Sequence, residues 1–220
     1  MTSSPLVERI DNEIHNRSLL KHPFYQKWNG GELTENHIRG YSKEYFSIVK
    51  AVPDLVSNVL DIASRNSLVQ TRAIRQNLLE ERDHIALWLR FCNSLDLSAK
   101  DVEEYDATPK TKEAINELKA LTSSSFEEAV AALYSYELEL PKISSKKIEG
   151  LKRFYNLRTR DALIYFETHE KADVRHAKVW RKMLETINDD EKQERAFKAT
   201  VRSLEAQRNL LDSVMEKYVN

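Results

Sequence analysis

The scarcity of helix-interrupting residues is the strongest constraint on what this chain can fold into. Its 220 residues include only four glycines and five prolines, whereas an all-β protein of this size needs many more turn residues. Glutamate, lysine, leucine, alanine and arginine, most of which favour helices, are abundant. The sequence therefore predicts an all-α protein with long helices.

The few helix-interrupting residues divide the chain into amphipathic segments. We expect helices over about 5–17, 23–29, 34–63, 67–93, 98–104, 106–122, 125–141, 142–155, 159–186 and 188–218. The third is expected to bend near Gly40 and Pro53, and the seventh to stop at Pro141. Because no repeat, low-complexity segment or linker is found, we predict one domain over residues 1–220, a bundle of seven or more helices.

Charge and cysteine content narrow the functional classes. The chain has 34 Lys and Arg against 35 Asp and Glu, a net charge of −1, which gives no reason to expect nucleic acid or an anionic membrane as a partner. A single cysteine, Cys92, excludes an internal disulfide and suits a reducing compartment. The first residues are polar and then amphipathic, without an apolar run, so we expect a cytoplasmic protein.

The stretch HEKADVRH places three metal-binding side chains on one side of a predicted helix. Asp173 follows His169 by four residues, and His176 follows it by seven. Since each helical residue advances about 100°, the three side chains fall within roughly 60° of arc. The stripe therefore either faces water or faces inward and binds something.

Two other predicted helices carry candidate ligands on apolar faces. His84 is preceded at helical spacing by Glu80 and Glu81, and Glu137 lies on an apolar stripe of its own helix. A carboxylate in such a place is costly unless it is paired or bound to a cation. Taken alone, His84 can equally be an interfacial histidine with satisfied hydrogen bonds, and Glu137 can pair with a lysine such as Lys147.

Together these residues supply three imidazoles and at least three carboxylates from three helices. Such a set could hold two divalent first-row metals in a bundle core, with positions left for O₂ and substrate. Mixed nitrogen and oxygen ligands favour iron or manganese chemistry with O₂. Spacing alone does not separate iron from manganese or zinc.

Five blocks in order carry a family resemblance that covers nearly the whole chain: LLKHPFYQKWNGGEL, IRGYSKEYF, NLLEERDHIALWLRF, ALYSYELELPKISSKKIEGL and YFETHEKADVRHAKVW. They resemble the haem-oxygenase-like helical proteins grouped with pyrroloquinoline quinone synthase C and the thiaminase-II-like proteins. The resemblance is greatest to the di-metal oxidase branch, in the subgroup of the chlamydial protein associating with death domains. The resemblance implies a haem-oxygenase-like fold.

The resemblance also implies a ligand set for two metal ions, Fe/Fe or Fe/Mn: Glu80 or Glu81, His84, Glu137, His169, Asp173 and His176. This chain is shorter than its relatives between the first glutamate and its histidine. We prefer Glu80 to Glu81, because an i,i+4 pair lies closer in azimuth than an i,i+3 pair. The cofactorless quinone-synthase branch and the thiaminase branch lack the full set, which counts against both.

Members of this subgroup resemble oxygen-dependent enzymes that supply para-aminobenzoate for folate. The resemblance implies that a tyrosine of the protein itself is the substrate and that a lysine donates the nitrogen, with O₂ and an external reductant as partners. The matching residues are Tyr25 and Lys147, and Tyr41 matches a tyrosine near the metals. Without the family, Tyr25 is also compatible with aromatic packing, Tyr41 with a core stripe and Lys147 with a solvated surface.

Alternatives remain open at this point, including a cofactorless quinone-synthase-C-like oxidase and a thiaminase-II-like enzyme. The same metals could act on a separate small molecule, in which case Tyr25 is dispensable. A non-enzymatic, partner-binding protein is the third hypothesis, and it rests on the name of the chlamydial relative. Relatives are commonly homodimers, so we expect a homodimer here.

Overall fold

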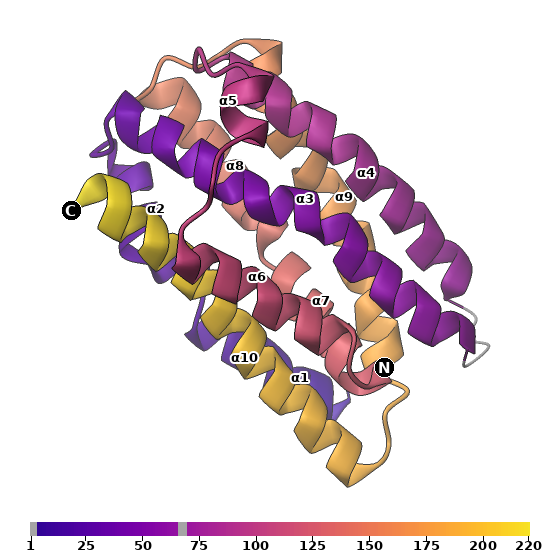
Figure 1. Cartoon of the computed structure of the whole chain (residues 1–220). Helices are drawn as coiled ribbons and strands as arrows, with labels where there is room; N and C mark the ends of the chain where they lie inside the picture. The colour runs from indigo at the N-terminus through magenta and orange to yellow at the C-terminus, as the bar shows by residue number, and fades with distance from the viewer. Residues whose placement is uncertain (1–3, 66–69) are drawn as a thin grey trace.

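The computed structural model describes residues 4–65 and 70–220, and every regular element in this part of the chain is helical (Figure 1). The all-α prediction, with seven or more helices, is confirmed. The α-helices are α1 (Pro5–Asn16), α2 (Pro23–Gly30), α3 (Glu35–Arg65), α4 (Thr71–Asn93), α5 (Ala99–Glu103), α6 (Pro109–Thr122), α7 (Phe126–Glu137), α8 (Leu140–Arg153), α9 (Arg160–Leu184) and α10 (Asp190–Val214). Two short elements, 3₁₀-helix η1 (Leu19–Lys21) and π-helix η2 (Met215–Val219), complete the set.

Local signals account for most helix boundaries. Ser125 caps α7 in a capping box with Glu128, and Gly31 closes α2 with a positive φ of 71°. The prediction that the seventh segment runs to Pro141 is wrong. The helix ends at Glu137, and Pro141 lies in the first turn of α8, where its missing N–H has no helical partner to lose.

The predicted start of the fourth helix near residue 67 lies outside the described residues, and α4 is described from Thr71. Helix α3 continues through Pro53 as one element of 31 residues. Gly40 in the same helix meets the ring of Tyr218, which occupies the space that a Cβ atom would need. A side chain at position 40 would therefore displace the ring of Tyr218.

Helices α4 and α9 pack next to each other. Helix α3 packs along α4, and α8 packs along α9, while α10 covers α6, α7 and α1 (Figure 1). The buried apolar side chains form one cluster that extends from Leu6 to Met215 and includes the three tryptophans Trp28, Trp88 and Trp180. This core fixes the relative rotation of α4, α7 and α9, which carry the candidate ligands.

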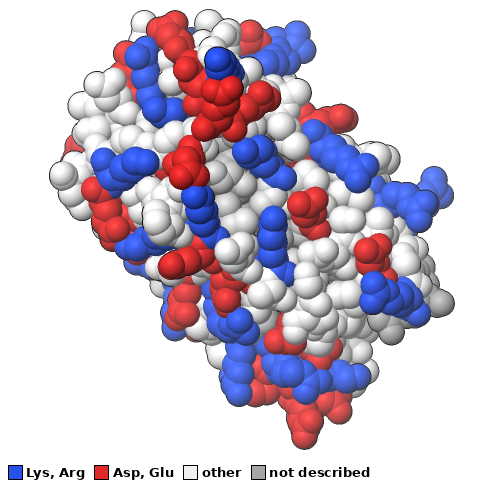
Figure 2. Space-filling model, in the orientation of Figure 1, with Lys and Arg blue, Asp and Glu red and all other residues white. Residues whose placement is uncertain are grey.

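On the face shown in Figure 2, basic and acidic side chains are interspersed, and the acidic ones are densest near the top of the view. Among the described residues, no helix is both long enough and apolar enough to cross a membrane.

Candidate metal centre

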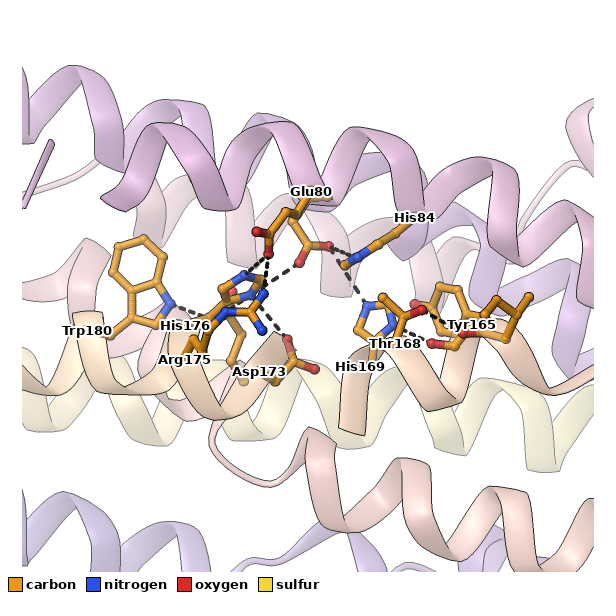
Figure 3. Close-up of polar contacts among 12 residues, drawn as sticks. Glu80, His84, Tyr165, Thr168, His169, Asp173, Arg175, His176 and Trp180 are labelled. Carbon is orange, nitrogen blue, oxygen red and sulfur yellow. Dashed lines mark hydrogen bonds and ion pairs between the residues drawn. The ribbon is translucent and has the colours of Figure 1, made fainter. Parts of the chain in front are cut away.

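A single buried cluster brings together candidate ligands from three helices. Helix α4 contributes two of them, the last residue of α7 contributes one, and α9 contributes three, all at most 5% exposed: Glu81, His84, Glu137, His169, Asp173 and His176. Figure 3 shows His84, His169, Asp173 and His176 directed into the space between α4 and α9. The HEKADVRH stripe therefore faces inward, and not toward water.

The cluster divides into two groups that share Glu81. Glu81 lies with His84 and His169 in one group, and with Asp173 and His176 in the other, with the candidate ligand atoms of each group within 4.8 Å of one another. Glu81 Oε2 lies 3.2 Å from His84 Nδ1 and 4.0 Å from His169 Nε2. Glu81 Oε1 lies 3.6 Å from His176 Nδ1. One carboxylate thus presents one oxygen to each group, as a bridging ligand does.

The geometry favours Glu81 over Glu80, against the preference drawn from the sequence. Glu80 belongs to neither group among the described residues, and its side chain is 24% exposed. The buried face of α4 includes Asn77, Glu81, His84 and Trp88. Glu81, three residues before His84, therefore lies inside, and Glu80, four residues before it, lies at the border of this face. The spacing of each glutamate from His84 does not determine which glutamate is buried, because the packing of α4 on α3 and α9 sets the rotation of the helix.

Several buried atoms of the cluster have no hydrogen-bond partner within the described part of the chain. They are Glu137 Oε1, both carboxylate oxygens of Asp173, and His176 Nδ1. The other oxygen of Glu137 accepts a hydrogen bond from Trp180 Nε1 at 2.6 Å and lies 3.9 Å from His176 Nδ1. Since unpaired buried polar atoms are costly, this set of nitrogen and oxygen atoms fits divalent cations. The alternative pairing of Glu137 with Lys147 is not found among the described residues, where the Lys147 amine donates to Tyr41.

Burial dominates the electrostatics of the cluster. It raises the pKa of Glu137 to about 8, and burial together with the charge of Glu81 raises the pKa of Asp173 well above its ordinary value. Burial also lowers the pKa of His169 to about 4. For Glu81, burial is outweighed by the hydrogen bond of His84 and the nearby imidazoles, which lower the pKa. A bound cation would lower the raised pKa values of Glu137 and Asp173, because it stabilises their ionised carboxylates.

Beside this cluster, Lys147 from α8 lies among aromatic rings. It is only 3% exposed, so the interpretation of Lys147 as a solvated residue is wrong. Its Nζ atom donates to the Tyr41 hydroxyl at 2.5 Å and lies 5.2 Å from the centre of the Tyr25 ring and 4.8 Å from that of Tyr45. Burial lowers the pKa of Lys147 to about 7 and raises the pKa of Tyr25 and Tyr41 well above 10.

A chain of ring contacts joins the lysine to the candidate ligands. The centre of the Tyr41 ring lies 5.1 Å from that of Tyr45, which lies 5.1 Å from that of Trp88. Trp88 lies 4.7 Å from Tyr165, and Tyr165 lies 4.1 Å from His169. The structure therefore brings the predicted substrate residues and the predicted ligands into one continuous buried region.

Comparison with known proteins identifies the family of this chain. Residues 6–217 match the TENA/THI-4/PQQC family. The chain belongs to this family. It is 32% identical to a 4-aminobenzoate synthase of Chlamydia muridarum, covering 97% of this chain and 92% of the relative. A 4-aminobenzoate synthase of Nitrosomonas europaea is 29% identical and covers 99% of this chain and 94% of its own length. A pyrroloquinoline-quinone synthase of Acidiphilium cryptum is 28% identical over 69% of this chain and 62% of its own length.

Solved structures of similar proteins show the fold of this chain. A CADD-like protein of unknown function from Nostoc punctiforme superposes with a TM-score of 0.82 at 12% identity, covering 98% of this chain and 97% of its own. A domain with a heme oxygenase-like fold from Shewanella denitrificans gives 0.81 at 18% identity, covering 96% and 91%. The predicted haem-oxygenase-like bundle is thereby confirmed.

Several residues around the candidate metal centre were not predicted from the sequence. Trp88 and Tyr165 each lie four residues from a candidate ligand, so the stripes that identified His84 and His169 also contain them. Trp180 follows His176 at the same spacing and bonds Glu137. Asn77, one turn before Glu81, is 2% exposed with both amide atoms unpartnered in the described chain. Extending each stripe by one turn would have found all of them.

Proposed function

We propose that this chain is an oxygen-dependent enzyme that forms para-aminobenzoate from its own Tyr25, with Lys147 as the amine donor. The observation that carries the proposal is the burial of the Lys147 amine against the rings of Tyr25 and Tyr41. The name 4-aminobenzoate synthase, given to relatives that align over nearly the whole chain, supports it.

The candidate ligands fit two divalent ions. Glu81, His84 and His169 would hold one ion, and Asp173 and His176, with Glu137 close by, would hold the other, with Glu81 shared. When bound, an Fe/Fe or Fe/Mn pair supplies the redox chemistry of O₂, with electrons from an external reductant. The unpartnered oxygens of Asp173 and Glu137 are the donors best suited to such ions.

Lys147 has the properties of an amine donor. With its pKa lowered to about 7 by burial, a large share of the side chain is neutral near pH 7 and carries a free lone pair. Its bond to Tyr41 fixes the orientation of the amine. Tyr25, which is 2% exposed, is held beside it without any diffusion step, and such positioning lowers the entropic part of the barrier.

The space beside Tyr25 favours an internal over an external substrate. A cavity lined by Tyr25, Tyr45 and Tyr136, among others, has a volume of about 20 Å³. This is enough for one molecule of the size of water, but it does not admit a free aromatic substrate. A separate aromatic molecule therefore has little room in the cavity beside the Tyr25 ring.

The experiment uses protein grown on tyrosine labelled in the ring and reconstituted with Fe²⁺ and Mn²⁺. After exposure to O₂ and a reductant, we expect labelled para-aminobenzoate at no more than one molecule per chain. Tyr25→Phe should retain its metal and form no product. Tyr155→Phe changes a tyrosine that packs on Trp28 and donates to its backbone carbonyl, and this variant should behave as wild type.

Two results would overturn the proposal. Product formed by Tyr25→Phe from an added compound would assign the same metals to a separate small molecule. A wild-type chain that takes up neither iron nor manganese would favour a partner-binding protein. A para-aminobenzoate auxotroph provides the matching test in cells. The wild-type gene should restore its growth, and the Tyr25→Phe gene should not.

A further inference from the structure

Glu80 contacts the candidate metal centre from outside, at the side of His176 that faces away from the other ligands. Glu80 Oε2 lies 2.8 Å from His176 Nε2. The opposite nitrogen of the same ring, Nδ1, faces Asp173 Oδ1 at 3.3 Å and Glu81 Oε1 at 3.6 Å. The His176 ring thus stands between Glu80 and the interior of the cluster (Figure 3).

The two nitrogens of His176 have different roles because of this contact. An ionised carboxylate only accepts hydrogen bonds, so the Nε2 atom that faces Glu80 must donate one. In a neutral imidazole the other nitrogen then carries the lone pair. That nitrogen is Nδ1, which is buried and has no hydrogen-bond partner among the described residues. The lone pair therefore points at the shared space of Glu81 and Asp173.

Glu80 is itself held in place from two further directions. Its Oε1 atom accepts a hydrogen bond from Gln76 Nε2 at 3.0 Å, one turn earlier on α4. Its Oε2 atom also accepts one from Arg175 Nη2 at 3.0 Å, across the gap to α9. Glu80 and Arg175 line an open groove between the two helices, together with Asp83. The carboxylate is thus fixed at the rim, where it cannot replace Glu81 without breaking these bonds.

We propose that Glu80 is a positioning residue: it accepts the Nε2–H of His176, fixes the tautomer of that ring and directs the Nδ1 lone pair at a cation held with Asp173 and Glu81. This inference rests on the proposed function, because it assumes a metal at the cluster. Carboxylates behind metal-bound histidines orient the ring and raise its basicity, and their loss costs about 10–100-fold in metal affinity.

Titration with Mn²⁺, followed by the electron paramagnetic resonance signal of the free ion, tests the effect on affinity. Glu80→Ala should still bind two ions per chain at saturation, with one of the two sites weakened by about 10–100-fold. Glu80→Gln should lose less, because its amide oxygen still accepts the Nε2–H. Asp83→Ala removes another carboxylate of the same groove and should bind as wild type does. If the Glu80→Ala chain saturates with one ion, Glu80 is itself a metal ligand. If both affinities are unchanged, Glu80 does not position His176 for metal binding. Either result overturns the inference.

Nitrogen chemical shifts of the metal-free protein test the orienting contact by itself. Long-range ¹H–¹⁵N correlation spectra of the neutral His176 ring should place its single proton on Nε2 in wild type and Glu80→Gln, and should show a mixture of tautomers in Glu80→Ala. A wild-type ring protonated at Nδ1 would overturn the inference. A wild-type chain that binds no Mn²⁺ overturns the proposed function and the affinity claim together, whereas the metal-free spectra still decide whether Glu80 orients His176.

Discussion

His169 Nδ1 lies 2.9 Å from the backbone carbonyl oxygen of Tyr165, one turn earlier on α9. Because a carbonyl only accepts, this nitrogen donates, and the His169 ring presents Nε2 to Glu81. His176, two turns later, presents Nδ1 instead, since its Nε2 faces Glu80. The two histidines of one helix thus point opposite ring nitrogens at the same carboxylate.

Removal of either α9 histidine should remove metal. We expect His169→Ala and His176→Ala to lose bound metal and O₂ consumption together, because each deletes a nitrogen donor of one group. Elemental analysis and an oxygen electrode measure the two quantities. His15→Ala, an exposed histidine of α1, is the control. Wild-type metal content in both variants would refute the ligand assignment.

Substitution of Glu81 should have a larger effect than substitution of Glu137. Glu81→Gln removes a carboxylate shared by both groups, so we expect fewer than one ion per chain. Glu137 lies near His176 alone among the imidazoles, so Glu137→Gln should keep the ion at His84 and His169. Metal content per chain, measured after passage over a desalting column, distinguishes the two. Equal losses would argue against a shared Glu81.

The stability of the fold should depend on pH through Lys147. Its folded pKa of about 7 lies below the ordinary value of 10.5, so between these values the unfolded chain binds more protons and stability rises with pH. Below pH 7 the cost of burying the amine is fully present. Lys147→Met should therefore be more stable than wild type by a few kcal/mol near neutral pH and below, and this advantage should shrink as the pH approaches 10.

Urea unfolding at several pH values measures this difference. Lys146→Met is the matched control, because Lys146 is exposed and pairs with Glu149 at the surface, so its effect on stability should be small. An advantage of Lys147→Met that stays constant or grows with pH would show that the Lys147 amine is charged in the folded chain.

Loss of the Tyr41 hydroxyl should separate positioning from metal binding. Tyr41→Phe keeps the ring in its contacts with Phe24 and Tyr45 but frees the Lys147 amine. We expect the yield of para-aminobenzoate to fall roughly tenfold or more, as misplacement of a reacting group commonly costs, with metal content unchanged. Mass spectrometry of the product and elemental analysis of the same sample test this. A parallel loss of metal would give Tyr41 a structural role instead.

The helices and the candidate ligands could be predicted from the sequence because both depend on local periodicity. The His169, Asp173 and His176 stripe needed only the helical repeat. The choice between Glu80 and Glu81 depended on how α4 is rotated against α3 and α9, which tertiary packing decides. The bond from Trp180 to Glu137 joins residues 43 positions apart, and no local pattern reveals it.

The burial of Lys147 shows the same limit. Lys146 and Lys147 are adjacent and chemically identical, yet one is exposed and the other is 3% exposed. The helical period puts Lys147 in line with Ile143 and Leu151 on the buried face of α8. A lysine on such a face can still extend its amine to water, so the period alone does not show that the amine is buried. The family resemblance, and not the residue pattern, selected the buried one.

Anomalous X-ray scattering from crystals of the protein loaded with Fe²⁺ and Mn²⁺ tests the central claim most directly. Data collected on both sides of the iron and manganese absorption edges should show two peaks per chain. One is expected within bonding distance of Glu81, His84 and His169, and the other within bonding distance of Glu81, Asp173 and His176. Absence of both peaks from the space between α4 and α9, in crystals of protein shown to be folded, would contradict the account.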